Sequence, residues 1–196
     1  IMLLSIITVN LNSGDNFRAT LDSLKEFLGL DSVEYIVIDG NSTDSSAICI
    51  EENTQLIDKL IVRCDGGIYD AMNQGIKIST GRWLWFINSG DLVTISPDLL
   101  LPILMCTQCN FIFSDVKAPG RVISQDFSLH YLARASINHQ NLVADRSLFS
   151  FGFDKRYRYC ADYKFIMDNF PSIRSLKIDF YLCDYDFKGR SSVRSR

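Results

Sequence analysis

The sequence of 196 residues contains no apolar run approaching the roughly 20 residues that a membrane-spanning helix requires. Its first residues, Ile1 to Leu4, lack the basic segment and the extended apolar stretch of a secretory signal peptide. These absences predict a cytoplasmic protein. In that compartment the six cysteines are expected to remain free thiols.

The sequence also lacks a large excess of charge of either sign, with 20 Lys and Arg against 23 Asp and Glu and a net charge of −3. A protein that coats nucleic acid needs a strong positive excess, so this class is excluded. The balance is uneven along the chain, because residues 1–150 carry −7 and residues 151–196 carry +4. The C-terminal part therefore either meets an anionic partner, such as a membrane surface, or forms a solvated basic edge.

The cysteines and histidines are not spaced as they are in common metal-binding motifs. Cys106 and Cys109 form the only C-x-x-C, and no second pair and no His-x-His accompany them. The apolar run from residue 99 to this pair is typical of the end of a helix. Buried thiols are therefore predicted here in preference to a zinc site.

What the first half of the chain does contain is an alternation of apolar strands and amphipathic helices. Strands are predicted at residues 4–9, 35–38, 60–62 and 83–87, and helices at about 17–28, 45–52 and 68–78. Trp83 and Trp85, at strand spacing, are expected in the core. This order predicts an α/β fold with a mainly parallel central sheet and helices on both faces. Because no repeat or linker interrupts the chain, we expect one domain over residues 1–196.

Polar residues gather directly after the first, second and fourth of these strands. They form three groups: Thr8 with Asn10, residues 39–44, and residues 88–91. The carboxyl ends of parallel strands share one edge of a sheet, and ligands bind in the crevice beyond that edge. The three groups are therefore predicted to converge on one crevice.

This crevice lacks two common nucleotide-binding loops. The segment after the first strand, residues 10–16, does not read G-x-G-x-x-G, and no Walker loop is present. Carboxylates remain as the chemical groups of interest. Asp91 follows a buried strand and would either hold a divalent cation or cap a turn or the next helix. Asp39 would either accept hydrogen bonds from a base or ribose or cap its own turn.

Four segments carry a family resemblance: Ser-Ile-Ile-Thr-Val-Asn at 5–10, Ile-Val-Ile-Asp-Gly-Asn-Ser-Thr-Asp at 36–44, Ile-Tyr-Asp-Ala-Met-Asn-Gln-Gly at 68–75, and Thr-Gly-Arg-Trp-Leu-Trp-Phe-Ile-Asn-Ser-Gly-Asp at 80–91. In this order they resemble family 2 glycosyltransferases of the GT-A fold, which use nucleotide-activated sugars and usually invert the anomeric centre. Asn-His-Gln at 138–140 and Cys-Ala-Asp-Tyr-Lys-Phe at 160–165 are similar to acceptor-side motifs of the family. The resemblance implies a GT-A nucleotide-binding sandwich with a nucleotide-sugar-binding half, residues 1–91, and an acceptor-side half with a basic tail, residues 92–196.

The resemblance also implies roles for individual residues. Asp162 takes the place of the catalytic base, and Asp91 that of the acid that ligates Mn²⁺ or Mg²⁺ beside the diphosphate. Gly90 stands where the family usually has an acid, and Asp44 matches a position that also suits a helix cap. The implied nucleotide contacts are Thr8, Asn10, Asp39 and Asn88, and the donor or diphosphate candidates are Asp70, His139, Lys188 and Arg190.

His139 is one of only two histidines, and its role stays open at this point between an acceptor or diphosphate contact, a metal ligand and a structural side chain. The leading functional hypothesis is an inverting, metal-dependent glycosyltransferase. Its expected partners are a nucleotide-sugar donor and a glycan or lipid-linked acceptor of surface polysaccharide synthesis, with peripheral membrane contact. The alternatives are a nucleotidyltransferase and a non-catalytic nucleotide-sugar-binding domain.

Overall fold

Seven strands form the central sheet of the computed structural model, which describes residues 2–118 and 120–184. Their order across the sheet is β10-β6-β9-β4-β1-β2-β3. The strands are β1 (Leu4–Asn10), β2 (Val33–Asp39), β3 (Lys59–Val62), β4 (Trp83–Phe86), β6 (Phe111–Ser114), β9 (Leu142–Asp145) and β10 (Ser175–Ile178). β9 runs antiparallel to both of its neighbours, and every other pair is parallel, which confirms the predicted mainly parallel sheet.

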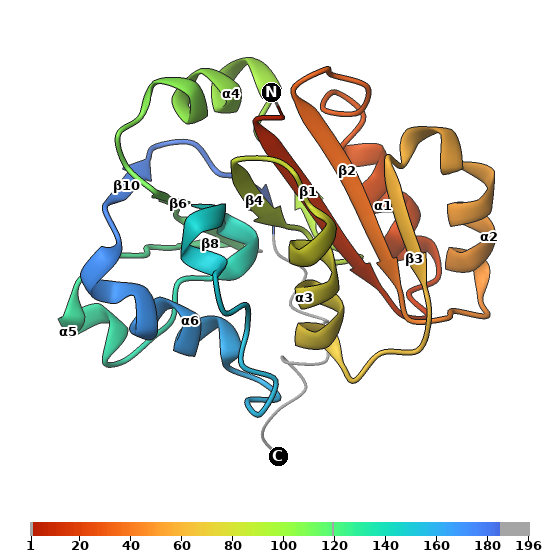
Figure 1. Cartoon of the computed structure of the whole chain (residues 1–196). Helices are drawn as coiled ribbons and strands as arrows, with labels where there is room; N and C mark the ends of the chain where they lie inside the picture. Colours follow the sequence, from red (N-terminus) through yellow and green to blue (C-terminus); the bar gives the residue numbers. More distant parts are fainter. Residues whose placement is uncertain (1, 119, 185–196) are drawn as a thin grey trace.

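Helices cover both faces of this sheet (Figure 1). One face packs against α1 (Asp15–Ser23), α2 (Ser45–Glu52) and α4 (Pro97–Cys106). The other packs against α3 (Ile68–Ile78), α5 (Leu129–Leu132) and α6 (Ala161–Asn169). Successive side chains of a strand point to opposite faces, so Ile6 of β1 enters the first core and Ile7 the second. No helix in the described residues is long and apolar enough to span a bilayer.

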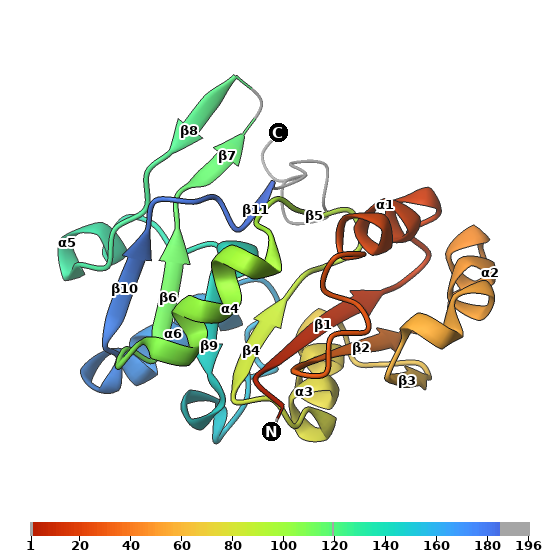
Figure 2. The same cartoon turned by 90° about the horizontal axis from the view of Figure 1, so that it is seen from above.

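A second sheet of four short strands lies beside the first and was not predicted. Its order is β5-β11-β7-β8, with β5 (Leu92–Val93), β11 (Cys183–Asp184), β7 (Val116–Ala118) and β8 (Arg121–Ile123). Figure 2 shows β7 and β8 projecting beyond the end of β6. Strands of two or three residues are too short to show an alternating pattern, so the sequence carries no signal for them. The 3₁₀ helices are η1 (Thr54–Leu56), η2 (His139–Asn141), η3 (Arg146–Phe149) and η4 (Phe170–Ser172).

The helices predicted at 45–52 and 68–78 are confirmed with those bounds, while the first helix is shorter than predicted. α1 ends at Ser23, and the apolar stripe continues through turns in which Leu24 and Phe27 remain buried. The core position of Trp83 and Trp85 is confirmed, since both side chains are fully buried. Their indole N–H groups donate to the carbonyls of Leu104 and Gln140.

The prediction of buried thiols at Cys106 and Cys109 is wrong. Cys106 is exposed and Cys109 is half-buried. α4 turns Leu100 and Leu104 into the core, and a residue two positions after Leu104 lies on the opposite side of a helix with 3.6 residues per turn. All six cysteines are free, as predicted.

A buried carboxylate ties the amino ends of the strands together. Glu34 of β2 is only 2% exposed and accepts hydrogen bonds from Ser5 Oγ at 2.6 Å and from the backbone N–H of Gly81 at 3.1 Å. Lys59 of β3 donates to its second oxygen at 2.6 Å. Gly81 is needed for this approach, because a Cβ there would lie 2.6 Å from the backbone nitrogen of Ser5.

Candidate active site

The three polar groups predicted to share a crevice do meet at the carboxyl edge of the sheet. Asn10, at the end of β1, donates from Nδ2 to Asp39 Oδ1 at the end of β2, at 2.7 Å. Its Oδ1 accepts from Ser89 Oγ at 2.9 Å, and Ser89 belongs to the turn after β4. One side chain thus joins three strand ends, which confirms the predicted convergence.

Asp39 and Asp44 hold the loop that follows β2. Asp39 accepts from the backbone N–H of Ser42 at 2.8 Å, and Asp44 caps α2 by accepting from the N–H of Ser46 at 3.0 Å. Asp44 also accepts from the N–H of Gly14 at 2.7 Å, which fixes the loop after β1. The two carboxylates therefore shape the loops at this edge of the sheet. Thr8 lies deeper, fully buried within β1.

The turn from residue 88 to 91 is held by the carboxylate at its end. Asp91 Oδ2 accepts from the N–H of Asn88 at 3.1 Å, and its carbonyl accepts from Thr20 Oγ1 at 2.9 Å. Gly90 adopts φ +108°, a left-handed conformation that other residues take at a cost. This backbone conformation favours glycine at position 90, where family 2 glycosyltransferases usually have an acidic residue. Asp91 therefore caps its own turn, which is one of the roles that the sequence left open.

Asp162, the predicted base, lies in the first turn of α6 and is held by three donors. Oδ1 accepts from Tyr69 Oη and from the N–H of Tyr163, each at 2.9 Å, and Oδ2 lies 3.2 Å from His139 Nδ1. Burial by itself raises the pKa of a carboxyl, but the hydrogen bonds from His139 and Tyr69 outweigh it and lower the pKa of Asp162 below its usual value. Burial and the neighbouring Asp162 charge together raise the pKa of Tyr69, so this hydroxyl stays a donor.

His139 connects Asp162 to the turn after β4. Its second nitrogen, Nε2, lies 2.8 Å from Asn88 Nδ2. An amide N–H that donates to Nε2 leaves the proton of a neutral imidazole on Nδ1, where it donates to Asp162. The sequence predicted Asn88, His139 and Asp162 as separate candidates, and the structure brings them into one hydrogen-bonded chain.

The antiparallel strand β9 explains why His139 reaches this edge. Its amino end lies at the edge where the parallel strands have their carboxyl ends. η2, which carries His139, directly precedes β9, and β4 lies beside it in the sheet. His139 therefore stands next to Asn88, which follows β4.

Asp70 follows Tyr69 in the first turn of α3. Its Oδ1 forms an ion pair with Lys155 Nζ at 2.8 Å, and Oδ2 accepts from the N–H of Gly66 at 3.0 Å. The Lys155 hydrogen bond is the largest of the contacts that lower the pKa of Asp70. Asp70 thus fastens the loop after η3 to α3. The two remaining donor candidates, Lys188 and Arg190, lie outside the described residues.

Sequence reasoning did not pair Tyr69 with Asp162. From the sequence, Tyr69 beside Gly66 and Gly67 is a candidate for touching the donor, and its partner Asp162 follows 93 residues later. The contact depends on α3 and α6 packing on the same face of the sheet. No local pattern of residues signals such a pair.

A divalent cation would find few protein ligands here. No group of three or more His, Cys, Asp or Glu side chains suited to a metal occurs in residues 2–118 and 120–184. Asn88 Oδ1 is buried without a hydrogen-bond partner in the described part of the chain, and it belongs to the same turn as Asp91. One carboxylate and one amide oxygen fit a cation that takes most of its remaining ligands from substrate phosphates and water.

Comparisons with known proteins agree with this geometry at the level of fold. The chain resembles the crystal structure of TarS residues 1–349 from S. aureus in complex with UDP, with a TM-score of 0.79 at 17% identity, over 94% of this chain and 60% of that one. It also resembles glucosyl-3-phosphoglycerate synthase from Mycobacterium tuberculosis in complex with Mn²⁺, UDP and glucosyl-3-phosphoglycerate. There the TM-score is 0.69 at 17% identity, over 94% of this chain and 72% of that one.

Curated relatives are more similar in sequence. An uncharacterized glycosyltransferase of Mycobacterium tuberculosis is 30% identical over 97% of this chain and 77% of its own length. A PGL/p-HBAD biosynthesis glycosyltransferase of Mycobacterium bovis is 30% identical over 83% of this chain and 68% of its own length. Residues 5–104 match the family model described as Glycosyl transferase family 2. With its GT-A fold, the chain belongs to glycosyltransferase family 2.

Proposed function

We propose that the chain is an inverting glycosyltransferase that moves a sugar from a nucleotide-sugar to a hydroxyl group of a glycan or lipid-linked acceptor. The observation that carries this proposal is the hydrogen-bonded chain from Asn88 through His139 to Asp162. This chain connects the carboxylate that we propose to face the acceptor directly with the turn that we propose to face the donor. A single-displacement transfer needs these two sides in one site.

Asp162 is proposed to act as general base. As the acceptor hydroxyl attacks C1 of the donor sugar, the new C–O bond forms, the bond from C1 to the diphosphate breaks, and Asp162 takes the hydroxyl proton. Its side chain is 19% exposed, so an acceptor oxygen can approach it. Among the described residues, Oδ2 contacts His139 alone, which leaves a lone pair of this oxygen for the proton.

On the donor side, Thr8, Asn10, Asp39 and Asn88 are proposed to bind or shape the nucleoside site. Asn10 and Asp39 are the last residues of β1 and β2, at the edge of the sheet where an acceptor for a base N–H or a ribose hydroxyl is required. Asp70 and His139 stay proposed donor-side contacts, and Lys188 and Arg190 stay predictions from the sequence.

A divalent cation, Mn²⁺ or Mg²⁺, is proposed as cofactor, with Asp91 and Asn88 Oδ1 as its protein ligands. When bound, such an ion stabilises the negative charge that gathers on the departing diphosphate. The solved glucosyl-3-phosphoglycerate synthase complex contains Mn²⁺ and UDP, which supports this assignment by analogy. The turn around Asp91 and Gly90 orients these ligands through its contacts with Thr20.

For the acceptor, we propose a sugar of a surface glycan, assembled at the inner face of the membrane by a cytoplasmic enzyme. The name of the M. bovis relative refers to PGL/p-HBAD biosynthesis, which supports a glycoconjugate acceptor. Residues 1–91 are proposed as the donor-binding half and residues 92–196 as the acceptor-side half.

A thermal-shift screen tests the proposal. UDP-, GDP-, CMP- and dTDP-sugars are each added with and without Mn²⁺, and at least one is expected to raise the melting temperature more with the metal. Slow release of free sugar from that donor is the expected second result. Binding without release or transfer of sugar would support the non-catalytic alternative, and pyrophosphate release from a nucleoside triphosphate would support the nucleotidyltransferase.

A further inference from the structure

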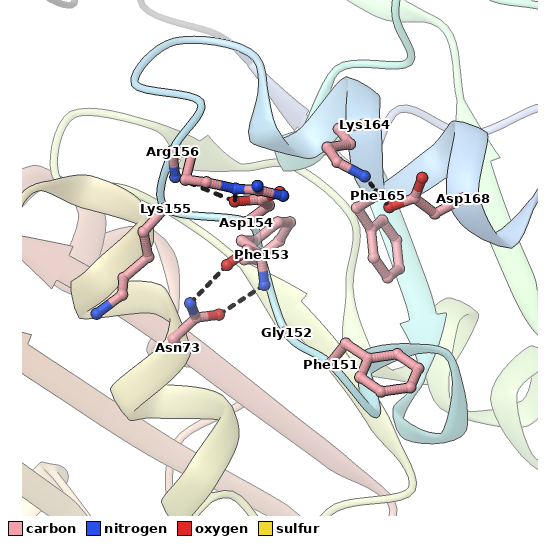
Figure 3. Close-up of a pocket in the computed structure, with 10 residues that line it drawn as sticks. All are labelled: Asn73, Phe151, Gly152, Phe153, Asp154, Lys155, Arg156, Lys164, Phe165 and Asp168. Atoms are coloured by element: carbon pink, nitrogen blue, oxygen red, sulfur yellow. Dashed lines mark hydrogen bonds and ion pairs between the residues drawn. The ribbon is translucent and has the colours of Figure 1, made fainter.

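A cavity of about 520 Å³ opens beside the candidate site, between α6 and the loop that follows η3 (Figure 3). Its walls come from that loop, from α6 and from one residue of α3. The lining residues are Asn73, Phe151, Gly152, Phe153, Asp154, Lys155, Arg156, Lys164, Phe165 and Asp168. The volume lies within the range of pockets that hold small organic ligands.

Aromatic rings form part of the wall. Phe153 and Phe165 are buried, with ring centroids 5.5 Å apart. Phe151, in contrast, is fully exposed although its neighbours in the loop are anchored. Asn73 holds the loop by donating to the carbonyl of Phe153 at 2.8 Å and accepting from its N–H at 2.7 Å. The Phe151 ring is therefore presented to solvent from a fixed backbone at the edge of the cavity.

The charged groups at the rim are already paired with one another. Arg156 forms an ion pair with Asp154 at 2.7 Å, and Lys164 forms one with Asp168 at 2.5 Å. Lys155 is paired with Asp70, as described above. An anionic ligand such as a phosphate group needs cations that are not already compensated. This rim suits a neutral ligand with many hydroxyl groups. The carboxylates can accept hydrogen bonds from such hydroxyl groups, and the guanidinium group can donate to them.

The cavity is close to the proposed base along two helices. Asn73 follows Tyr69 by one turn of α3, and Phe165 follows Asp162 by about one turn of α6. One to two helical turns correspond to about 5–10 Å. This distance is within the length of a short saccharide whose end reacts at Asp162.

We propose that this cavity binds a pyranose of the acceptor glycan that does not itself react. This inference rests on the proposed function, because it assigns the cavity to that enzyme's acceptor. The apolar face of the pyranose packs on Phe151, and its hydroxyl groups bond to Asp154 and to its ion-pair partner Arg156, which also line the cavity (Figure 3). Contacts with a remote part of a substrate supply binding energy that positions the reacting part.

The experiment places a fluorescent reporter in the cavity. Phe151→Trp keeps an aromatic ring at the edge, while Trp83 and Trp85 in the core give a constant background. Methyl glycosides of glucose, mannose, galactose and N-acetylglucosamine are titrated into this variant. At least one is expected to change the tryptophan emission in a saturable way, because the sugar covers the indole.

Two further variants locate the binding. Phe180→Trp introduces the same reporter at a half-exposed phenylalanine outside the cavity, and its emission is expected to stay constant. Asp154→Asn, combined with Phe151→Trp, is expected to weaken the saccharide at least tenfold, because a charged acceptor is lost. The absence of a saturable change with every glycoside, or the same change in both reporters, would overturn the proposal.

A parallel titration with the nucleotide-sugars separates this inference from the proposed function. Glycoside binding in the cavity of a chain that binds no nucleotide-sugar would refute the transferase while leaving the cavity a saccharide site. Nucleotide-sugar binding and transfer without any glycoside response at Phe151→Trp would refute only the cavity.

Discussion

His139 Nδ1 lies 3.2 Å from Asp162 Oδ2, and this contact joins the 3₁₀ helix before β9 to the first turn of α6. The opposite ring nitrogen contacts Asn88, in the turn after β4. An imidazole bonded on both sides has a fixed ring plane and a fixed tautomer. Asp162 is consequently held in one orientation relative to the turn after β4, which we propose to face the donor.

Asp162→Asn is expected to reduce sugar transfer by roughly 10²–10⁴-fold while donor affinity stays unchanged. The amide keeps the size of the side chain and can still accept from Tyr69, but it cannot take a proton from the acceptor. Initial rates of transfer and nucleotide-sugar titrations measure the two quantities separately. Asp98→Asn, in the first turn of α4, is the matched control. An equal loss of transfer and donor affinity would give Asp162 a structural or donor-binding role instead.

Tyr69→Phe is expected to shift the acid limb of the kcat/KM profile to higher pH. Tyr69 stabilises the ionised form of Asp162, so the loss of its hydroxyl raises the pKa of Asp162 and a larger fraction is protonated on the acid side. The Phe side chain keeps the ring contact with Phe153. The profile is measured from about pH 4 to 8.

Tyr163→Phe is the control for this shift, because its hydroxyl donates to the carbonyl of Leu132 and not to Asp162. If the acid limb of the kcat/KM profile shifts equally in Tyr69→Phe and Tyr163→Phe, that limb reports the pKa of a group other than Asp162. The same linkage acts on stability. The pKa of Asp162 is lower in the folded protein than in the unfolded chain, so its ionised carboxylate stabilises the fold at any pH above the unfolded-state pKa. This contribution is lost as the pH falls through the pKa that Asp162 has in the folded protein.

Asp91→Asn is expected to weaken Mn²⁺-dependent binding of UDP at least tenfold. The amide oxygen can still accept from the N–H of Asn88, so the turn is retained while the charge that would attract the cation is lost. Calorimetric titrations of UDP with and without Mn²⁺ measure the effect. Unchanged metal-dependent affinity would show that another side chain holds the ion.

Glu34→Gln is expected to lower the free energy of unfolding by about 1–3 kcal/mol, because an NH2 group replaces the oxygen that accepts from Lys59 and two donors then face each other. Burial opposes the ionisation of Glu34, but the hydrogen bonds from Lys59, Ser5 and Thr80 lower its pKa to about 2. Its contribution is therefore complete above the usual value of 4.5 and is lost as the pH falls from there through about 2.

Urea unfolding of wild type and Glu34→Gln at pH 7 measures the difference in stability. Glu52→Gln is the control, because Glu52 pairs with Arg18 at the surface with both side chains more than half exposed. A surface pair of this kind contributes at most about 1 kcal/mol. Equal losses in the two variants would contradict the role given to Glu34.

The sequence by itself determined the elements whose residues repeat with a clear period. The runs that became β1, β2 and β4 are long and apolar enough to be recognised, and α2 and α3 have the predicted bounds. The polar groups after the strands are also visible, and the rule for parallel strands predicted that they meet. These features follow from local chain geometry, which neighbouring residues report directly.

Only the tertiary structure decided which of the candidate residues touch. Asn88 and His139 are 51 residues apart, and Tyr69 and Asp162 are 93 apart. Their contacts depend on the insertion of β9 between β4 and β6 in the antiparallel sense, and on α3 and α6 sharing one face of the sheet. Strand order and direction are set by the packing of the whole core, and because that packing has no local period, no stretch of the sequence reports it.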